Sequence, residues 1–416
     1  MTLVEIKNVA TVVRGVSFDK AEVIAEPRVG YVPVLRAGNI DVDLLVDRDL
    51  VWVPENRVGK EQRMRPGDIA ICMSSGSPAV VGKTATLRTP WPGSVGAFCA
   101  IVRPITAKVL PEYLSFFLQS ETFRTWTRQS SGANIKNIRK SELESFLVPV
   151  PNPDAQRRIV DLLSRAEGIV RLRREAKAKA QQIIPALFLD MFGDPATNPK
   201  GWPLTTLAEI VKDGPSNGLY KHKSAYGTGT PILRIDGFYD GVVRDLASLP
   251  RVRIEDNEAK RFALKADDIV INRVNSPDYL GKSAIIPALD EKTVFESNMM
   301  RLSVDCDQAL PRFVVALLQT TAARRHFLSR AKHAINQSSI NQQDVKSLPV
   351  FLPPVRYQVE FKRRAEMTES IGYQQAVAHS KAEAALKALL ARAFSDSARR
   401  LAEQLAPAHV GSAQPA

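Results

Sequence analysis

Two kinds of hydrophobic spacing follow one another along the chain. Short runs in which apolar and polar residues alternate predict β-strands, and an apolar residue at every third or fourth position predicts a helix. The expected strands lie around residues 4–13, 32–36, 69–73, 82–87 and 97–103, and the expected helix lies over residues 111–129. A longer stretch after residue 150 has apolar residues at alternating steps of four and three, which is the spacing of a coiled-coil seam.

This longer stretch predicts a helix of about 38 residues, or about 57 Å at 1.5 Å per residue. Asn152-Pro153-Asp154 is a start signal with Asp154 as the N-cap, Gly193-Asp194-Pro195 is a stop signal, and Pro185 predicts a kink. A second long helix follows near the C-terminus, and the two are expected to pair antiparallel. The predicted pairing seam consists of Ile159, Leu162, Ile169, Ile183 and Leu187 in the first helix and Phe361, Ile371, Ala378, Ala382, Ala385 and Leu389 in the second.

The sequence also repeats itself. RPGDIAICMSSGSPAVVGKTATL at 65–87 returns as KADDIVINRVNSPDYLGKSAII at 265–286, and ALFLDMFGD at 186–194 returns as ALLARAFSD at 388–396. A period of about 200 residues indicates two tandem copies of one domain rather than a solenoid. The predicted fold class is α+β: two mixed α/β domains separated by two long antiparallel coiled-coil helices, with a pseudo-two-fold axis. The predicted boundaries are 1–150 for the first domain, 151–195 for the first helical spacer, 196–352 for the second domain, 353–405 for the second spacer and 406–416 for a disordered tail.

One part of the repeat, SSGSPAVVGKTATL, looks at first like a phosphate-binding loop. Such a loop needs four residues between its first glycine and the Gly-Lys pair, whereas five separate Gly76 from Gly82. The second copy keeps Gly281-Lys282 but has Asn275 where the first glycine should be. A nucleotide-dependent enzyme that uses residues 76–84 is therefore the less favoured alternative. Both copies instead predict a structural hairpin with a polar tip.

Composition favours a polyanionic partner. The formal net charge is +13 and the pI is about 9.7, which points most simply to nucleic acid. A structural scaffold on which this charge is incidental is the other alternative. Cys72, Cys99 and Cys306 lack CxxC spacing and are expected to be reduced core thiols, and the five histidines predict no metal site. No apolar run reaches the roughly eighteen residues of a membrane span, and the N-terminus lacks signal-peptide features, so we expect a cytoplasmic protein without membrane contact.

Several phrases carry a resemblance to a known family. They are IKNIRKSELESFLVPVPNPDAQRRIVDLLSRAEGI at 135–169, ALFLDMFGDP at 186–195, and the strand pairs GDIAIC…GKTATL and DDIVIN…GKSAII. In the order, spacing and duplication of these phrases, nearly the whole chain resembles the DNA-specificity subunit of type I restriction-modification systems.

The resemblance implies two target-recognition domains, each reading one half of a split, asymmetric double-stranded DNA sequence. It also implies two helical regions that set the spacing and bind two copies of an adenine-N6 methyltransferase subunit. Restriction and translocase subunits would complete the complex. S-adenosylmethionine, ATP and Mg would then bind to the partner subunits, and neither a catalytic nor a metal-binding residue is expected in this chain.

Candidate DNA contacts are polar and basic residues at strand-end turns, because Lys and Arg contact phosphates while Arg, Asn, Gln, Ser and Thr reach base edges. Base readers should differ between the two copies, since two half-sites normally differ. A solvated loop residue is the alternative at each position, and for Lys83 and Lys282 a shared hairpin role is favoured. The candidates are Arg36, Asn39, Ser74, Ser75, Ser77, Lys83, Asn134, Lys136 and Asn137 in the first copy, and Arg234, Arg273, Asn275, Ser276, Lys282, Asn336, Gln337 and Asn341 in the second.

Overall fold

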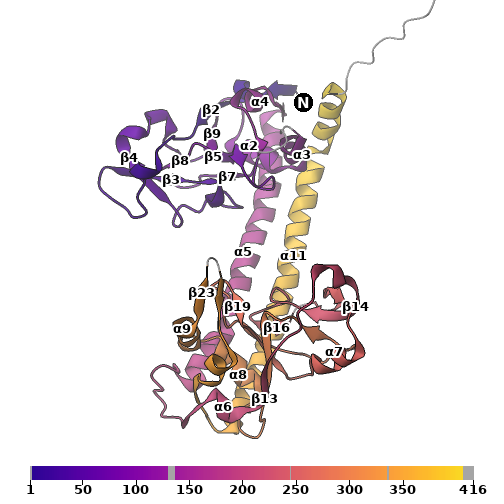
Figure 1. The fold of residues 1–416 in the computed structure, drawn as a ribbon. Helices are drawn as coiled ribbons and strands as arrows, with labels where there is room; N and C mark the ends of the chain where they lie inside the picture. The colour runs from indigo at the N-terminus through magenta and orange to yellow at the C-terminus, as the bar shows by residue number, and fades with distance from the viewer. Residues whose placement is uncertain (1, 130–135, 244, 335–336, 406–416) are drawn as a thin grey trace, which may run out of the picture. The chain divides into compact units, whose positions relative to one another are not determined.

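The computed structural model describes residues 2–129, 136–243, 245–334 and 337–405, and it divides into two compact units. Unit 1 comprises Met1–Leu172 and His379–Ala416, and unit 2 comprises Arg173–Ala378. Each unit contains one mixed α/β domain and parts of two long helices, α5 (Pro153–Phe192) and α11 (Val355–Leu405) (Figure 1). The tail expected to be disordered, 406–416, lies outside the described residues.

The mixed α/β domain of unit 1 is small and contains two main sheets. A four-stranded sheet has the order β2-β9-β5-β7, and a three-stranded sheet has the order β4-β3-β8. Its strands are β1 (Thr2–Glu5), β2 (Ala10–Arg14), β3 (Tyr31–Leu35), β4 (Val51–Pro54), β5 (Ile69–Cys72), β6 (Ser74–Ser75), β7 (Thr84–Thr86), β8 (Ser94–Val95), β9 (Cys99–Pro104), β10 (Lys136–Asn137) and β11 (Leu147–Val150). Its short helices are α1 (Ile6–Val9), α2 (Pro111–Gln119), α3 (Glu121–Gln129) and α4 (Lys140–Ser145).

The mixed α/β domain of unit 2 repeats this plan with a six-stranded sheet, of order β13-β22-β18-β20-β16-β15. Its strands are β12 (Leu204–Thr206), β13 (Val211–Asn217), β14 (Tyr226–Leu233), β15 (Phe238–Tyr239), β16 (Gly241–Val243), β17 (Arg251–Val252), β18 (Ile269–Asn272), β19 (Val274–Asn275), β20 (Ser283–Ile285), β21 (Val294–Phe295), β22 (Met299–Val304), β23 (Lys332–Ala334), β24 (Gln337–Ser339) and β25 (Pro349–Phe351). Its short helices are α6 (Leu207–Ile210), α7 (Asp256–Arg261), α8 (Pro311–Leu318), α9 (Thr321–Arg330) and α10 (Gln342–Lys346).

Two predicted elements of unit 1 are wrong in detail. The strand expected over 4–13 is interrupted by α1, because Ile6 and Val9 both turn inward at helical spacing and are buried. The helix expected over 111–129 is two helices. Ser120 breaks it with an extended backbone, and its Oγ donates a hydrogen bond to the Phe117 carbonyl at 2.7 Å.

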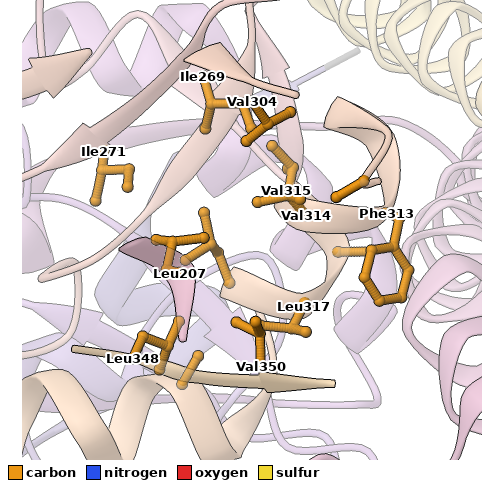
Figure 2. Close-up of a cluster of buried hydrophobic side chains, with 14 of the residues drawn as sticks. Leu207, Ile269, Ile271, Val304, Phe313, Val314, Val315, Leu317, Leu348 and Val350 are labelled. Atoms are coloured by element: carbon orange, nitrogen blue, oxygen red, sulfur yellow. The ribbon is translucent and has the colours of Figure 1, made fainter. Parts of the chain in front are cut away.

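The largest buried cluster of unit 2 lies between its sheet, helix α8 and the strand pair β12–β25. Figure 2 shows Ile269 and Val304 from the sheet above Val315 and Leu317 of α8, with Val350 below. Apolar residues from four sequence segments thus share one core. The last turn of α5 adds Phe188 and Phe192 to it, and Phe192 meets Phe313 edge-to-face at 5.1 Å between ring centroids.

Within each unit, the start of one long helix lies with the end of the other. In unit 1, Leu163 of α5 shares a buried cluster with Phe394 of α11, and Phe394 also meets Phe117 of α2 at 5.4 Å. In unit 2, Phe188 near the end of α5 meets Phe361 near the start of α11 at 5.7 Å. Both contacts require an antiparallel pair, so that prediction and the predicted fold class are confirmed.

The predicted seam needs correction at five of its eleven positions. Leu162, Ile169 and Ile183 of α5 are 48%, 53% and 44% exposed, while the next residues along the chain, Leu163 and Val170, are buried and Ile184 is partly buried. Two apolar stripes lie side by side on α5, and spacing alone does not determine which one faces the partner helix. On α11, Ile371 and Ala385 are likewise exposed.

The remaining seam residues are buried or partly buried, as the prediction requires. Phe361 is fully buried, and the partly buried residues are Ile159, Leu187, Ala378, Ala382 and Leu389. Of these, Ile159 and Leu389 pack against the buried cluster of unit 1, and Leu187 packs against that of unit 2.

The helix start also differs from the prediction. The side chain of Asn152, not Asp154, caps α5 by accepting a hydrogen bond from the Ala155 N–H at 2.9 Å. Pro153 occupies the first helical position, where its fixed φ and missing N–H are favourable, and this places the cap one residue before it. Asp154 instead pairs with Arg157 at 2.6 Å. Helix α5 continues through Pro185 and ends before Gly193, whose φ is +84°.

Candidate nucleic-acid interface

In unit 1 the fold brings together two of the predicted contact loops. Strand β6 pairs antiparallel with β10, so that Ser74 lies opposite Asn137 and Ser75 lies opposite Lys136. Ser77 is exposed, and its N–H donates to the Ser75 hydroxyl at 3.1 Å, which orders the turn. Asn134 lies outside the described residues.

Unit 2 builds the same strand pair with different side chains. Strand β19 pairs with β24, so that Asn275 lies opposite Ser338, and β24 pairs with β23. Asn275 and Ser276 are half-buried, and the Asn275 side chain accepts a hydrogen bond from the Ser276 N–H at 2.8 Å. Gln337 is exposed in β24, whereas Asn336 lies outside the described residues. A strand pair of the same backbone pattern thus presents different polar groups in the two units.

The Gly-Lys pair of each copy is part of a closed hairpin, not a phosphate cradle. The Gly82 N–H donates to the Cys72 carbonyl at 2.9 Å, and the Gly281 N–H donates to the Asn272 carbonyl at 2.9 Å. Both glycines have φ of +76°. Because these N–H groups are used inside the hairpin, the alternative of a nucleotide-dependent enzyme is not favoured.

The two lysines that follow are engaged within their own units. Lys83 lies 3.4 Å from the Asp41 carboxylate. Lys282 donates to the Ile235 carbonyl at 2.6 Å, and its ammonium lies 3.8 Å from the ring centroid of Tyr239 and 5.3 Å from that of Tyr279. The shared hairpin role favoured for these lysines agrees with these contacts.

The third predicted contact loop, which contains Arg36 and Asn39, differs most from the prediction. Asn39 is buried, its side-chain oxygen accepts from the Arg36 N–H at 2.8 Å, and its amide donates to the carbonyls of Leu45 and Arg48. A DNA contact for Asn39 is therefore wrong, because its hydrogen bonds hold the following loop together. The Arg36 side chain is exposed and donates to the Asp49 carbonyl at 3.1 Å.

Arg234, the counterpart of Arg36 in unit 2, is held by a carboxylate. Its Nε lies 3.4 Å from Glu296, whose side chain also accepts from the Ile235 N–H at 2.6 Å. Burial raises the pKa of the Glu296 carboxyl above its ordinary value, while the Ile235 N–H and Arg234 oppose that change. Arg234 thus lies at the surface but already has a partner.

A polar cleft of about 360 Å³ opens beside the β19–β24 strand pair, and we call it the unit 2 cleft. It brings together residues from the β13 end, the β18–β19 turn and α10. Its lining is Asn217, Arg273, Asn341, Gln342, Gln343 and Lys346. Sequence reasoning found only Arg273 and Asn341. The amide-rich run that follows Asn341 was a signal for the α10 residues, but nothing in the sequence pointed to Asn217.

Two further classes of site can be addressed for the described residues. Among them, no group of three or more His, Cys, Asp or Glu side chains is placed to hold a metal ion. No helix in the described ranges has the length and apolar character needed to cross a membrane.

Comparisons with known proteins identify the family. Residues 1–182 match the family model described as type I restriction modification DNA specificity domain. The specificity subunit of the type I restriction enzyme StySPI from Salmonella potsdam is 30% identical over 406 residues, covering 94% of this chain and 87% of that protein. The EcoKI specificity subunit from Escherichia coli K12 is 30% identical over 410 residues, with the same shares covered.

Solved structures agree in fold. The S subunit of a type I restriction-modification system from M. genitalium has a TM-score of 0.52 at 12% identity, covering 94% of this chain and 96% of its own. A chain from another type I R-M system has a TM-score of 0.53 at 16% identity, covering 94% of this chain and 97% of its own. The chain therefore belongs to the specificity subunits of type I restriction enzymes, the non-catalytic DNA-recognition components of these complexes.

Proposed function

We propose that this chain reads a bipartite, asymmetric double-stranded DNA site, with each recognition domain reading one half-site. The observation that carries the proposal is the duplicated antiparallel strand pair, which has the same backbone pairing in β6–β10 and β19–β24 but different side chains. Phosphates are alike in any two half-sites, whereas the bases differ. A common backbone with different polar side chains suits the reading of two different base sequences. The net charge of +13 supports affinity for the DNA backbone.

The long helices are proposed to recruit two methyltransferase subunits. Large apolar side chains recur on their solvent-exposed faces, and such surfaces commonly bind other proteins. They are Leu162, Ile169 and Leu172 in unit 1, and Ile183, Met367, Ile371 and Tyr373 in unit 2. Restriction and translocase subunits would complete the complex in the cytoplasm. S-adenosylmethionine, ATP and Mg would bind to those partners and supply the methyl group, the energy and the metal chemistry.

Mapping N6-methylated adenines in the host genome, with and without this gene, tests the proposal. The intact strain should carry methylated adenines in a split, asymmetric site, the deletion strain should lose them, and a plasmid copy should restore them. Unchanged adenine methylation in the deletion strain would contradict the proposal. The scaffold alternative also predicts no salt-dependent DNA affinity for the purified complex, whereas DNA reading predicts affinity that falls steeply with salt.

A further inference from the structure

The unit 2 cleft carries two cations that no described residue neutralises. Arg273 and Lys346 line it together with four amide side chains, and no carboxylate belongs to the lining. Among the described residues, neither Arg273 nor Lys346 forms a salt bridge, in contrast to Arg234 and Arg301 of the same unit. Arg, Asn and Gln are the side chains that most often hydrogen-bond base edges.

Arg273 is also anchored. One terminal nitrogen of its guanidinium donates to the Ser297 carbonyl at 3.1 Å, and its Nε is buried without a hydrogen-bond partner in the described part of the chain. The side chain as a whole is half-buried. The guanidinium presents five donors in a rigid fork, so an anchored arginine keeps N–H groups for a ligand and loses little conformational freedom when it binds one.

The first copy provides an internal comparison, because Met73 occupies the same backbone position as Arg273. The Met73 N–H donates to Phe98, and its carbonyl accepts from Ile138. Arg273 repeats both bonds, at 2.9 Å each, with Asn298 and Ile340. Met73 is nonetheless an apolar, buried residue. A phosphate contact would serve both half-sites alike, whereas a change from methionine to arginine suits a difference in the bases read.

We propose that Arg273 is a specificity-determining residue, which donates two hydrogen bonds from the unit 2 cleft to the O6 and N7 acceptors of one guanine in the half-site read by unit 2. The inference rests on the proposed function and names one determinant of it. Guanine is favoured because a bidentate arginine matches its two adjacent acceptors. The Asn341 side-chain oxygen caps α10 by accepting from the Gln343 and Asp344 N–H groups. The other amides of the cleft, those of Asn217, Gln342 and Gln343, therefore remain for the neighbouring base pairs.

The test replaces Arg273 on the host chromosome and maps methylated adenines. Arg273→Met installs the residue of the first copy, and Arg273→Lys keeps the charge but loses the planar fork. Both variants should leave the first half-site unchanged. In the other half-site they should lower discrimination at one G·C position about tenfold or more, since a bidentate contact supplies roughly that much. Arg253→Met is the matched control, because Arg253 is exposed in the same domain and its guanidinium hydrogen-bonds only the Ser224 carbonyl among the described residues.

The possible outcomes distinguish a failure of the proposed function from a failure of the assignment of Arg273. If the unaltered strain has no split methylated site, the proposed function itself fails. If that site is present and Arg273→Lys leaves every position unchanged, or lowers methylation uniformly without relaxing any base, the assignment of Arg273 is overturned. Arg273→Lys decides the matter even if the methionine variant is unstable. Binding of the purified complex to four duplexes that differ only at the relaxed position should show a preference for guanine that both variants lose.

Discussion

At the residue scale, one glycine in each copy lets the Gly-Lys hairpin approach a helix closely. A Cβ added at Gly82 would lie 2.5 Å from a methyl carbon of Thr127, and one added at Gly281 would lie 2.4 Å from the Phe327 ring. Both positions also have φ of +76°, which disfavours any other residue. This steric requirement explains why a glycine recurs at this position in both copies, without any role in binding a nucleotide.

We therefore expect Gly82→Ala and Gly281→Ala each to lower the free energy of unfolding by more than about 1 kcal/mol. Gly76→Ala is the control, because no atom lies within 4 Å of its added Cβ, and its effect should stay within about 0.5 kcal/mol. Urea unfolding followed by circular dichroism measures all three. A stable Gly82→Ala protein beside a destabilised Gly76→Ala protein would contradict the hairpin assignment.

At the element scale, adjacent leucines on α5 separate the two roles given to this helix. Leu163 is fully buried, whereas Leu162 is 48% exposed. Leu163→Ala should cost about 2–5 kcal/mol of stability, as expected for a cavity in a core. Leu162→Ala should change stability by less than about 0.5 kcal/mol, yet it should weaken co-purification of the methyltransferase subunit. Thermal unfolding and pull-down with that subunit test both, and equal stability losses would contradict the observed register.

The central sheet of unit 1 protects two of the three cysteines. Cys72 of β5 lies opposite Cys99 of β9, and both are buried, while Cys306 in unit 2 is exposed, so the expectation of a core thiol is wrong for Cys306. Titration of the native protein with a thiol reagent should therefore reveal one rapidly reacting thiol, and unfolding in urea should reveal all three. Cys306→Ser should remove the rapid phase. Rapid reaction of the Cys306→Ser protein would contradict the burial of the other pair.

Sequence patterns predicted the positions of helices and strands more reliably than they predicted which face of a helix is buried. Strands β3, β5, β7 and β9 follow apolar runs that local spacing detects. The buried face of α5 was harder to predict, because positions 162 and 163 are both leucine and only contact with the partner helix distinguishes them. Asn39 looked like a polar loop tip, but its amide closes a loop through Leu45 and Arg48, a tertiary contact that no local pattern encodes. The unit 2 cleft joins segments more than a hundred residues apart, which explains why Asn217 was missed.

At the scale of the whole molecule, the repeat is the feature that the sequence predicted best. In both copies, the strand through which the chain enters the recognition domain pairs with the strand through which it leaves that domain. Leu3 of β1 lies opposite Pro149 of β11, and Leu204 of β12 lies opposite Phe351 of β25. Because entry and exit lie side by side, one domain can replace the other while the long helices stay intact.

This exchange of domains tests most directly whether each copy reads one half-site. Residues 204–351 are replaced by a second copy of residues 3–149, and methylated adenines are mapped in a host that lacks the native gene. The account predicts that the asymmetric site becomes a palindromic split site, made of the first half-site and its inverted repeat. Methylation that still follows the original asymmetric site would contradict the account.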